Sequence, residues 1–265
     1  IHNRNFKWNT NFVLSYYRNY YVKRDANYVL GINETQRQDV NDMWQYVVDG
    51  MIPAGNPNAG ALKFKDLNGY LRDDSGNIVM VNGKPAYSGS PDGMIDEADM
   101  IYKGNSTPIP FSLNNSFEFG KFDVNVYFYG MFNNWQNNST YTMFAGNLQN
   151  VALYGENTLK SLANRWSYDN LNSSIPSIFA HVESTAAQRN GYYLEKAWFL
   201  RCDNVSLGYT FKTKKSNKYF SSLRVYAAAR NLFVITPYSG SDPETDSQAA
   251  YPNSRTYTFG IDITF

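Results

Sequence analysis

Two short stretches rich in Asp, Asn and Gly carry the clearest chemical pattern in the sequence, at residues 66–69 and 92–99. Placed end to end, they match a calcium-binding loop, in which alternate residues supply oxygen ligands, a glycine makes the sharp turn and a carboxylate closes the site. The candidate ligands are Asp66, Asn68, Asp92, Met94 through its backbone carbonyl, Asp96 and Asp99. The pattern indicates a candidate Ca²⁺ site, and the alternative is a polar loop of Asx turns without an ion.

Groups that could make or break bonds are otherwise scarce. Two pairs of neighbouring carboxylates could serve as acid–base pairs of the kind found in glycosidases: Asp96 with Glu97, and Asp242 with Glu244. Proximity along the chain does not set the separation that such a pair needs, so solvated loop charge explains them better. One cysteine, Cys202, is expected to be a small packed side chain, and the motifs of serine hydrolases, zinc proteases and phosphate-binding loops are missing. The sequence therefore predicts a protein that is not an enzyme.

The composition indicates what kind of framework holds these residues. The chain has 265 residues, a formal net charge of +1 and a mean hydropathy of −0.50, yet 17% of its residues are aromatic. A chain that is polar on average and rich in aromatics interleaves apolar with polar residues, as a β-sandwich or a membrane β-barrel does. The near-neutral charge gives no sign of a nucleic-acid partner, and no apolar run approaches the roughly 18 residues of a membrane helix.

Alternation of apolar and polar residues predicts several antiparallel strands with two different faces. The members of the apolar face are Phe6, Trp8, Thr10, Phe12, Leu14 and Tyr16; Phe111, Leu113, Phe117 and Phe119; Phe122, Val124, Val126 and Phe128; Val205, Leu207, Tyr209 and Phe211; Leu223, Val225, Ala227 and Ala229; and Tyr257, Phe259, Ile261, Ile263 and Phe265. The polar face includes Arg224 and Arg230, which a dry core disfavours and a hydrated lumen accommodates. Gly120-Lys121 joins two of the segments and predicts a two-residue type II′ turn.

The final segment is the most informative of these. Residues 257–265 alternate up to the last position, which is Phe265. A strand of this kind that ends in an aromatic residue resembles the assembly signal of outer-membrane β-barrels. The candidate signal residues are Tyr257, Phe259, Ile261, Ile263 and Phe265. Termini of soluble domains are usually polar and frayed, so this strand favours a barrel over a sandwich.

Long polar stretches separate the predicted strands, at residues 24–110, 133–192 and 236–255. We expect them to be irregular loops gathered at one end, with short turns at the other, which is typical of outer-membrane barrels and unusual in compact soluble domains. Several aromatic side chains in or beside these loops could stack on a substrate, and the alternative is that they pack the loops together or sit in an interfacial girdle. These candidates are Trp135, Tyr141, Tyr154, Trp166 and Trp198.

Seven segments together resemble the C-terminal third of SusC-like (SusC/RagA) TonB-dependent outer-membrane transporters of Bacteroidota. They are MWQYVVDGM (43–51), KFKDLNG (63–69), PDGMIDEADMIYKGN (91–105), PFSLNNSFEFGKFDVNVYFYGMF (110–132), FLRCDNVSLGYTF (199–211), LRVYAAARNLFVITPYSGSDPE (223–244) and YPNSRTYTFGIDITF (251–265). The resemblance implies an all-β fold, an antiparallel transmembrane β-barrel of 22 strands with long extracellular loops and a plugged lumen. It also implies uptake of a bulky nutrient, an oligosaccharide or a peptide, energised by TonB through the plug.

The same resemblance implies how the chain is organised and which partners it has. Residues 1–265 correspond to the C-terminal portion of the barrel, so the plug and the N-terminal strands are expected in a remainder outside this chain. The expected surroundings are that remainder, a lipid bilayer and a SusD-like surface lipoprotein. Residues 70–91 depart from the family, because they interrupt an Asp/Asn loop that SusC-like proteins often carry unbroken. The alternative from the residues alone is a secreted β-sandwich that binds carbohydrate through exposed aromatics.

Overall fold

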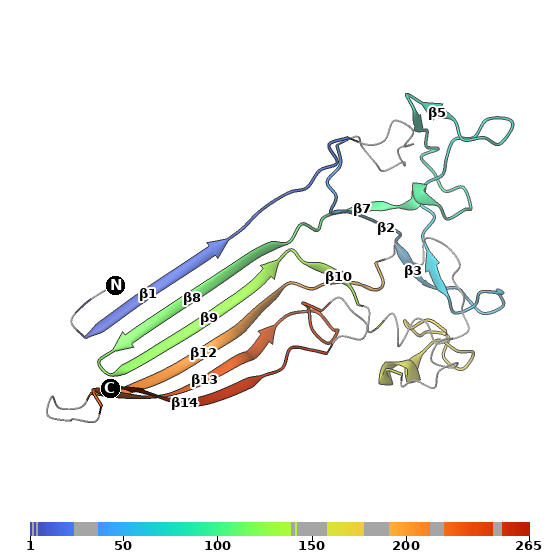
Figure 1. Ribbon diagram of the computed structural model, residues 1–265. Coiled ribbons are helices and arrows are strands. Elements are labelled where there is room, and N and C mark those ends of the chain that lie inside the picture. The colour runs from blue at the N-terminus through green and yellow to red at the C-terminus, as the bar shows by residue number, and fades with distance from the viewer. Residues whose placement is uncertain are drawn as a thin grey trace.

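The computed structural model describes residues 1, 3, 5–23, 37–138, 141, 158–177, 191–212, 220–245 and 251–265. Its main feature is a six-stranded antiparallel sheet in the order β1-β8-β9-β12-β13-β14 (Figure 1). The strands are β1 (Phe6–Leu14), β8 (Ile109–Phe119), β9 (Phe122–Phe132), β12 (Phe199–Lys212), β13 (Ser222–Ile235) and β14 (Thr256–Thr264). The mostly β, antiparallel character predicted from alternation is confirmed. The sheet is open, with β1 and β14 as its edges, so barrel closure is not seen in the described residues.

The strand register confirms the two predicted faces, because residues of like character lie opposite each other on neighbouring strands. Pairs on the apolar face include Trp8 with Phe117, Leu113 with Phe128, Leu207 with Ala227, and Ala227 with Phe259. Pairs on the polar face include Lys7 with Glu118, Asn114 with Tyr127, Ser206 with Ala228, and Ala228 with Thr258. Side chains one residue apart on a strand point to opposite sides, so this register separates the two characters across the whole sheet.

The apolar face is open to its surroundings. Phe259 is 82% exposed and Ile261 is 64% exposed, and Phe12, Leu207 and Val225 are also exposed large hydrophobics. Soluble monomers rarely expose a contiguous apolar surface of this extent. The six-stranded sheet therefore has one face that requires an apolar medium or partner.

Two local features of the sheet decide where side chains point. Gly120 has a φ of 61° and lies between the paired residues Phe119 and Phe122, so the predicted two-residue turn with glycine first is confirmed. The register of β12 shifts between Cys202 and Asn204 against both of its neighbours. A shift of this kind is a β-bulge, which re-aims side chains next to it. Cys202 is buried and free, as expected.

The connecting segments contain more regular structure than predicted. They hold four two-stranded sheets: β2 (Asp42–Gln45) with β7 (Ile101–Asn105), β3 (Val48–Met51) with β4 (Leu62–Phe64), β5 (Met80–Val81) with β6 (Lys84–Pro85), and β10 (Trp135–Asn137) with β11 (Leu194–Lys196). Two short 3₁₀ helices, η1 (Glu97–Asp99) and η3 (Lys160–Asn164), accompany them. The prediction of irregular loops is corrected here, because pairings too short to show periodicity organise much of residues 37–138.

The small sheets gather at one end of the six-stranded sheet, opposite the Gly120-Lys121 turn (Figure 1). This agrees with the predicted asymmetry between long connections at one end and a short turn at the other. A cluster of Tyr46, Met100, Trp44 and Phe64 packs together there. Tyr154 and most of the basic linker at residues 212–222 lie outside the described residues. No helix in the described part of the chain is long and apolar enough to cross a membrane.

Candidate functional site

A buried arginine at the bulge of β12 organises the polar face near the long connections. The Arg201 side chain is 2% exposed and lies 2.6 Å from Asp242 Oδ1 and 2.5 Å from Glu244 Oε2. Arg201 also donates to Asn231 Oδ1, and the Tyr129 hydroxyl donates to Glu244 at 2.9 Å. The Arg201 Nε atom meets Glu244 as an ion pair without hydrogen-bond geometry. Two ion pairs of Arg201 therefore attach the segment of residues 236–245 to the six-stranded sheet.

This arrangement corrects the prediction of solvated loop charge for Asp242, whereas Glu244 is exposed, as predicted, although it pairs with Arg201. Asp242 is 3% exposed, because Arg201 lies opposite it on a strand that is distant in sequence. A buried charge is costly unless it is paired and hydrogen-bonded, and the bulge at Cys202/Asn204 helps to bring these partners together. The pair has a structural role, and nothing in its geometry supports acid–base chemistry.

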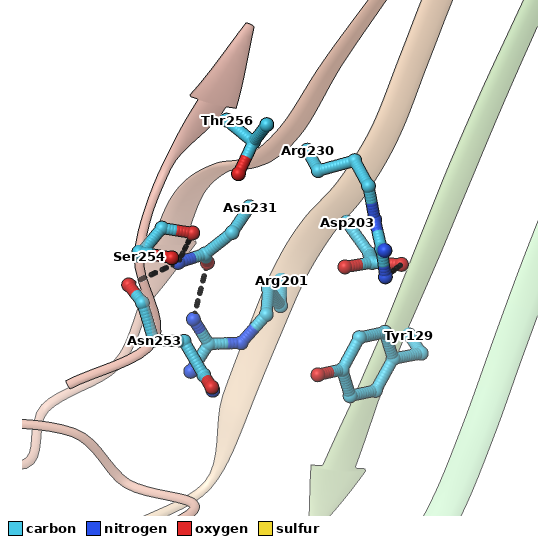
Figure 2. Close-up of a pocket in the computed structure, with 8 residues that line it drawn as sticks. All are labelled: Tyr129, Arg201, Asp203, Arg230, Asn231, Asn253, Ser254 and Thr256. Atoms are coloured by element: carbon cyan, nitrogen blue, oxygen red, sulfur yellow. Dashed lines mark hydrogen bonds and ion pairs between the residues drawn. The ribbon is translucent and has the colours of Figure 1, made fainter. Parts of the chain in front are cut away.

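A pocket of about 300 Å³ opens beside this arginine. Figure 2 shows its lining residues, with Arg201 joined to Asn231 by a hydrogen bond and Arg230 beside Asp203. Arg230 and Asp203 are 3.8 Å apart, and the Arg230 side chain is 69% exposed. Positive charges in the pocket thus face negative ones, as expected for a hydrated polar wall rather than for a site that selects one charge.

A second charged cluster crosses the middle of the polar face. Arg224 on β13 contacts Asp262 on β14 at 2.9 Å and Asp123 on β9 at 2.6 Å, although β12 lies between β13 and β9. The side chain passes over Gly208 of β12, where a Cβ atom would stand 2.4 Å from Asp123 Oδ1 and 2.6 Å from Arg224 Nε. Glycine at this position therefore permits an ion pair that spans three strands.

A groove of about 460 Å³ lies between residues 43–48 and the two-stranded β10–β11 sheet. Its lining includes Met43, Gln45, Val48, Lys103, Trp135 and Tyr192. Lys196 lies over the Trp135 ring, with Nζ 5.7 Å from the ring centroid, and this cation–π contact orients the indole. The volume falls within the roughly 300 to 1,000 Å³ of ordinary ligand pockets. This groove is a candidate binding site.

Gln45 has an unusual position in this groove. The residue is 7% exposed, and a Cβ atom on Gly191 would stand 2.9 Å from its Oε1 atom. On the opposite wall, the Tyr192 hydroxyl donates to the Ser174 carbonyl and lies 3.1 Å from the Tyr141 hydroxyl. Burial, followed by the hydrogen bond with Tyr141, raises the pKa of Tyr192, so its hydroxyl stays protonated.

The aromatic candidates from the sequence fall into different surroundings. Trp135 lines the groove, and Tyr141 packs against Tyr192 at its edge. Trp166 is 4% exposed and packs against Tyr168, so its ring holds the loops together. Trp198 is partly exposed and does not line the groove, and Tyr154 lies outside the described residues.

Sequence reasoning missed Gln45 and Tyr192. A signal for Gln45 was present, since it is the only amide in the otherwise apolar run of residues 43–48. A polar side chain in such a run is expected to be buried with a specific task. Tyr192 carries no comparable signal, because tyrosines are frequent throughout this chain.

The divided Asp/Asn loop is brought together in space. Asp66 accepts hydrogen bonds from the backbone N–H groups of Asp92 at 3.2 Å and Gly93 at 2.6 Å. Asp99 is fully buried and accepts from Leu67 at 2.6 Å, from Asn68 at 3.0 Å and from Asp96 at 2.9 Å. The two ends of the insertion at residues 70–91 therefore lie close together, and the β5–β6 hairpin forms part of the insertion between them (Figure 1).

These hydrogen bonds bear on the candidate Ca²⁺ site. Both oxygens of Asp99 accept from backbone amides, and Asp92 and Asp96 each accept from a nearby backbone amide as well. No group of three or more acidic, His or Cys side chains in the described residues is arranged to hold a metal ion. Burial, then the charges of Asp92 and Asp99, raise the pKa of Asp96. The geometry matches a loop of Asx turns more closely than an ion cage, and the Ca²⁺ site stays a prediction.

Comparison with known proteins finds distant relatives among TonB-dependent receptors. No family model matches the chain. It is 29% identical over 194 residues to the TonB-dependent receptor SusC of Bacteroides thetaiotaomicron, covering 69% of this chain and 18% of that protein. It is 24% identical to the TonB-dependent receptor P3 of Formosa agariphila, covering all of this chain and 27% of that protein. The chain therefore spans less than a third of the length of these relatives.

Solved structures give the same result for the fold. The structure of the RagAB peptide transporter superposes on the whole chain with a TM-score of 0.67 at 21% identity, using 28% of the RagAB chain. The RagAB peptide importer in its closed-closed state superposes with a TM-score of 0.62. TonB-dependent receptors are outer-membrane proteins and form a non-enzymatic family. Motif order, fold and these matches agree that the chain is a distant homologue of SusC/RagA-type TonB-dependent receptors and corresponds to a fragment of them.

Proposed function

We propose that this chain forms the C-terminal wall and outward loops of a TonB-dependent transporter in a bacterial outer membrane. The carrying observation is the exposed apolar face of the sheet. On β14 alone, Tyr257, Phe259, Ile261 and Ile263 are 51% to 82% exposed. Apolar side chains that point outward in alternation with polar ones pointing inward are the pattern of a barrel wall between lipid and a hydrated lumen.

The open edges of the sheet support a larger barrel. An unpaired edge strand in hydrocarbon leaves its N–H and C=O groups without partners, which the membrane interior does not tolerate. β1 and β14 are therefore proposed to pair with the remainder of a 22-stranded barrel. A plug within that barrel would transmit energy from TonB, and a SusD-like lipoprotein would close the outer side.

The proposed task of this segment is confinement and binding rather than bond chemistry. The polar face, with its ion pairs at Arg224 and Arg201, would line the hydrated path. The small sheets and loops would face the cell exterior and contact a bulky nutrient, an oligosaccharide or a peptide. Among the aromatic candidates, Trp135 and Tyr141 are proposed as substrate contacts, because both lie at the groove or its edge.

Two further roles belong to the same proposal. The apolar residues of β14 together with Phe265 are proposed as the assembly signal for insertion into the outer membrane. The loop at Asp66 and Asp99 is proposed to fix the base of the inserted β5–β6 hairpin, with or without Ca²⁺. Calorimetric titration of the protein with CaCl₂ would decide between these two forms.

A secreted β-sandwich that binds carbohydrate is the competing function. A sandwich buries its apolar face against a second sheet, whereas the apolar residues of β14 are exposed in this chain. Fractionation of the whole native polypeptide tests the choice. We expect it in the outer-membrane fraction, soluble only with detergent, and able to support growth on its nutrient only when TonB is present. A protein that stays monomeric and folded in plain buffer would contradict the proposal.

A further inference from the structure

The β5–β6 hairpin and the chain beside it carry large apolar side chains in exposed positions. Leu71, Ile78, Met80 and Val81 are 36% to 55% exposed. Residues one apart on a strand point to opposite sides, so Met80 and Val81 put apolar surface on both sides of the hairpin. A two-stranded hairpin is marginally stable in water unless its apolar side chains pack against a further layer. This surface therefore favours a partner.

The turns of the insertion have a fixed conformation. Asp73 accepts hydrogen bonds from the backbone N–H groups of Ser75 at 2.9 Å and Asn77 at 2.8 Å. Asn82 and Gly83 have φ values of 53° and 75°, the positive values that a type I′ hairpin turn requires. A surface that is ordered before binding loses less conformational entropy when a partner binds. The apolar side chains are therefore presented on a preformed support.

The base of the insertion is also tied to the Asp/Asn loop. The Gly69 carbonyl accepts a hydrogen bond from the Ser88 N–H group at 2.8 Å. The rings of Tyr70 and Tyr87 stack with their centroids 6.2 Å apart. These contacts fix the place from which the hairpin projects.

The position of the hairpin indicates which part of a barrel it would meet. Figure 1 shows β5 at the outer end of the connecting segments, on the β1 side of β7 and β3. β1 is an open edge of the six-stranded sheet, and the chain matches 28% of the RagAB chain. A barrel wall that continues past β1 brings the outward loops of its next strands to this side of the hairpin.

From these observations we infer that the β5–β6 hairpin is an interaction surface for an outward loop of the remainder of the transporter, next to β1. The inference rests on the function proposed above, in which that remainder pairs with β1. The loop presents apolar side chains to Leu71, Met80 and Val81. The contact joins the two parts of the barrel at its outer rim, in addition to the strand pairing within the membrane.

The charge of the insertion supports an apolar partner. Residues 70–91 contain two basic and two acidic side chains, so their formal charges cancel. An acidic lipid surface attracts clusters of Lys and Arg, and the insertion has no such cluster. Burial of apolar side chains with a polar rim is the pattern of a protein–protein contact.

Photochemical crosslinking of the whole native polypeptide in isolated outer membranes tests the partner directly. Benzoylphenylalanine replaces Met80, the membranes are illuminated, and the crosslinked peptides are identified by mass spectrometry after proteolysis. We expect crosslinks to a segment of the same polypeptide outside residues 1–265. The same group at Asp74, in the polar turn of the insertion, is the control and should give a much lower yield.

Each other result of the crosslinking would overturn the inference. Crosslinks from position 80 to a separate protein would identify a different partner, and crosslinks to lipid would assign the hairpin to the membrane surface. Crosslinks only within residues 1–265, or equal yields at positions 80 and 74, would show that no outward loop of the remainder is bound there.

Deletion of residues 70–91 tests whether the contact orders the bound loop. A Cβ atom on Gly69 would stand 2.5 Å from Asp92 Cβ, so the two ends are close enough to rejoin. We expect the amides of the crosslinked loop to exchange about 10-fold faster with solvent, because apolar side chains no longer cover it. The middle of β13 should keep its protection.

A second variant guards against misfolding of the shortened chain. Met80→Gln combined with Val81→Thr keeps the hairpin and replaces two apolar side chains by polar ones of similar size, so it should also speed exchange in that loop. Asp74→Asn is its control and should exchange like the unmodified protein. Unchanged exchange in both the deletion and the double variant would contradict the inference.

Failure of the transport function would look different. A whole polypeptide that is absent from the outer membrane contradicts the proposed function and this inference with it. A polypeptide that is present there, supports TonB-dependent growth and gives no crosslink between position 80 and the remainder contradicts only the role of the hairpin.

Discussion

The six-stranded sheet and the connecting segments at its end are organised by different forces. In the sheet, apolar side chains point out of one face and remain exposed, so nothing in the described chain buries them. In the connecting segments, buried charges and backbone amides meet specific side chains, as at Asp39 and Asp99. The difference shows that the sheet depends on its surroundings, whereas the connecting segments carry much of their order within themselves.

Ion pairs and hydrogen bonds of buried side chains hold the connecting segments together, because the apolar cluster there is small. Asp39 is almost fully buried and accepts hydrogen bonds from Arg18 at 2.8 Å and from the Asn41 backbone at 2.9 Å. Burial by itself would raise the pKa of Asp39, but the Asn41 and Arg18 contacts outweigh it and hold the pKa below its usual value. The folds of the two regions should therefore respond to different perturbations.

The largest loss of stability is expected at Arg201, whose buried ion pair with Asp242 joins residues 236–245 to the six-stranded sheet. Arg201→Met leaves Asp242 buried without its partner, and breaking a buried ion pair in this way costs about 3–5 kcal/mol. Hydrogen exchange should show residues 236–245 losing protection while the middle of β13 keeps it. Arg230→Met, at a 69% exposed side chain, is the control and should change little. Equal effects of the two variants would show that the buried ion pair at Arg201 stabilises residues 236–245 no more than an exposed arginine does.

The next effect tests the sheet itself with two adjacent alanines. Ala227 lies opposite Phe259 on the apolar face, and Ala228 lies opposite Thr258 on the polar face. Ala227→Arg should destabilise the protein in lipid by about 2–4 kcal/mol, because arginine would face hydrocarbon. Ala228→Arg should be tolerated. Unfolding in urea from lipid vesicles measures both, and the opposite order would mean that the faces are assigned the wrong way round.

A smaller effect compares two glycines of the sheet. A Cβ on Gly130 would stand 2.1 Å from the Phe199 carbonyl oxygen, which is backbone and cannot move aside alone. Gly130→Ala should cost about 1–3 kcal/mol through overpacking. Gly208→Ala meets the flexible ends of Asp123 and Arg224 and should cost less. Thermal unfolding in detergent compares the two, and a larger loss at Gly208 would show that the ion pair matters more than backbone spacing.

The smallest effect is a dependence on pH in the connecting segments. Glu195 accepts hydrogen bonds from Asn138 and from the backbone and side chain of Ser239. Burial opposes ionisation, but these bonds prevail and hold the pKa of Glu195 below 4.5. Their stabilisation is present above about pH 4.5 and is lost as the pH falls through the lower folded-state value.

The exchange protection of the Ser239 amide should therefore decrease in acid, after correction for the intrinsic exchange rate. Glu195→Gln cannot ionise and should show no such step. A step that persists in this variant would assign the pH response to another group.

The sequence was a good guide to the sheet because alternation is a local property. Trp8, Leu207 and Phe259 take the faces that their neighbours in sequence predict, and the Gly120-Lys121 turn follows from glycine's freedom at positive φ. The extent of β12 and β13 was underestimated, since alternation is lost at the bulge near Cys202.

The candidate sites were harder to predict because their partners are distant in sequence. Asp242 meets Arg201, and the wall of the groove at Trp135 faces Gln45 across a long separation. The Asp/Asn loop was recognised as a unit despite its insertion. Residue types alone could not predict that backbone N–H groups donate hydrogen bonds to the Asp99 carboxylate.

One measurement tests the lipid-facing wall most directly. In a Cys202→Ser background, single cysteines at positions 257 to 263 are spin-labelled, and their collision rates with oxygen and with a water-soluble nickel complex are measured in lipid vesicles. Labels at Phe259 and Ile261 should favour oxygen, which concentrates in hydrocarbon, while labels at Thr258 and Asp262 should favour nickel. The measurement uses the whole native polypeptide; alternating positions that all prefer the nickel complex, or a whole polypeptide that will not enter vesicles at all, would contradict the lipid-facing assignment.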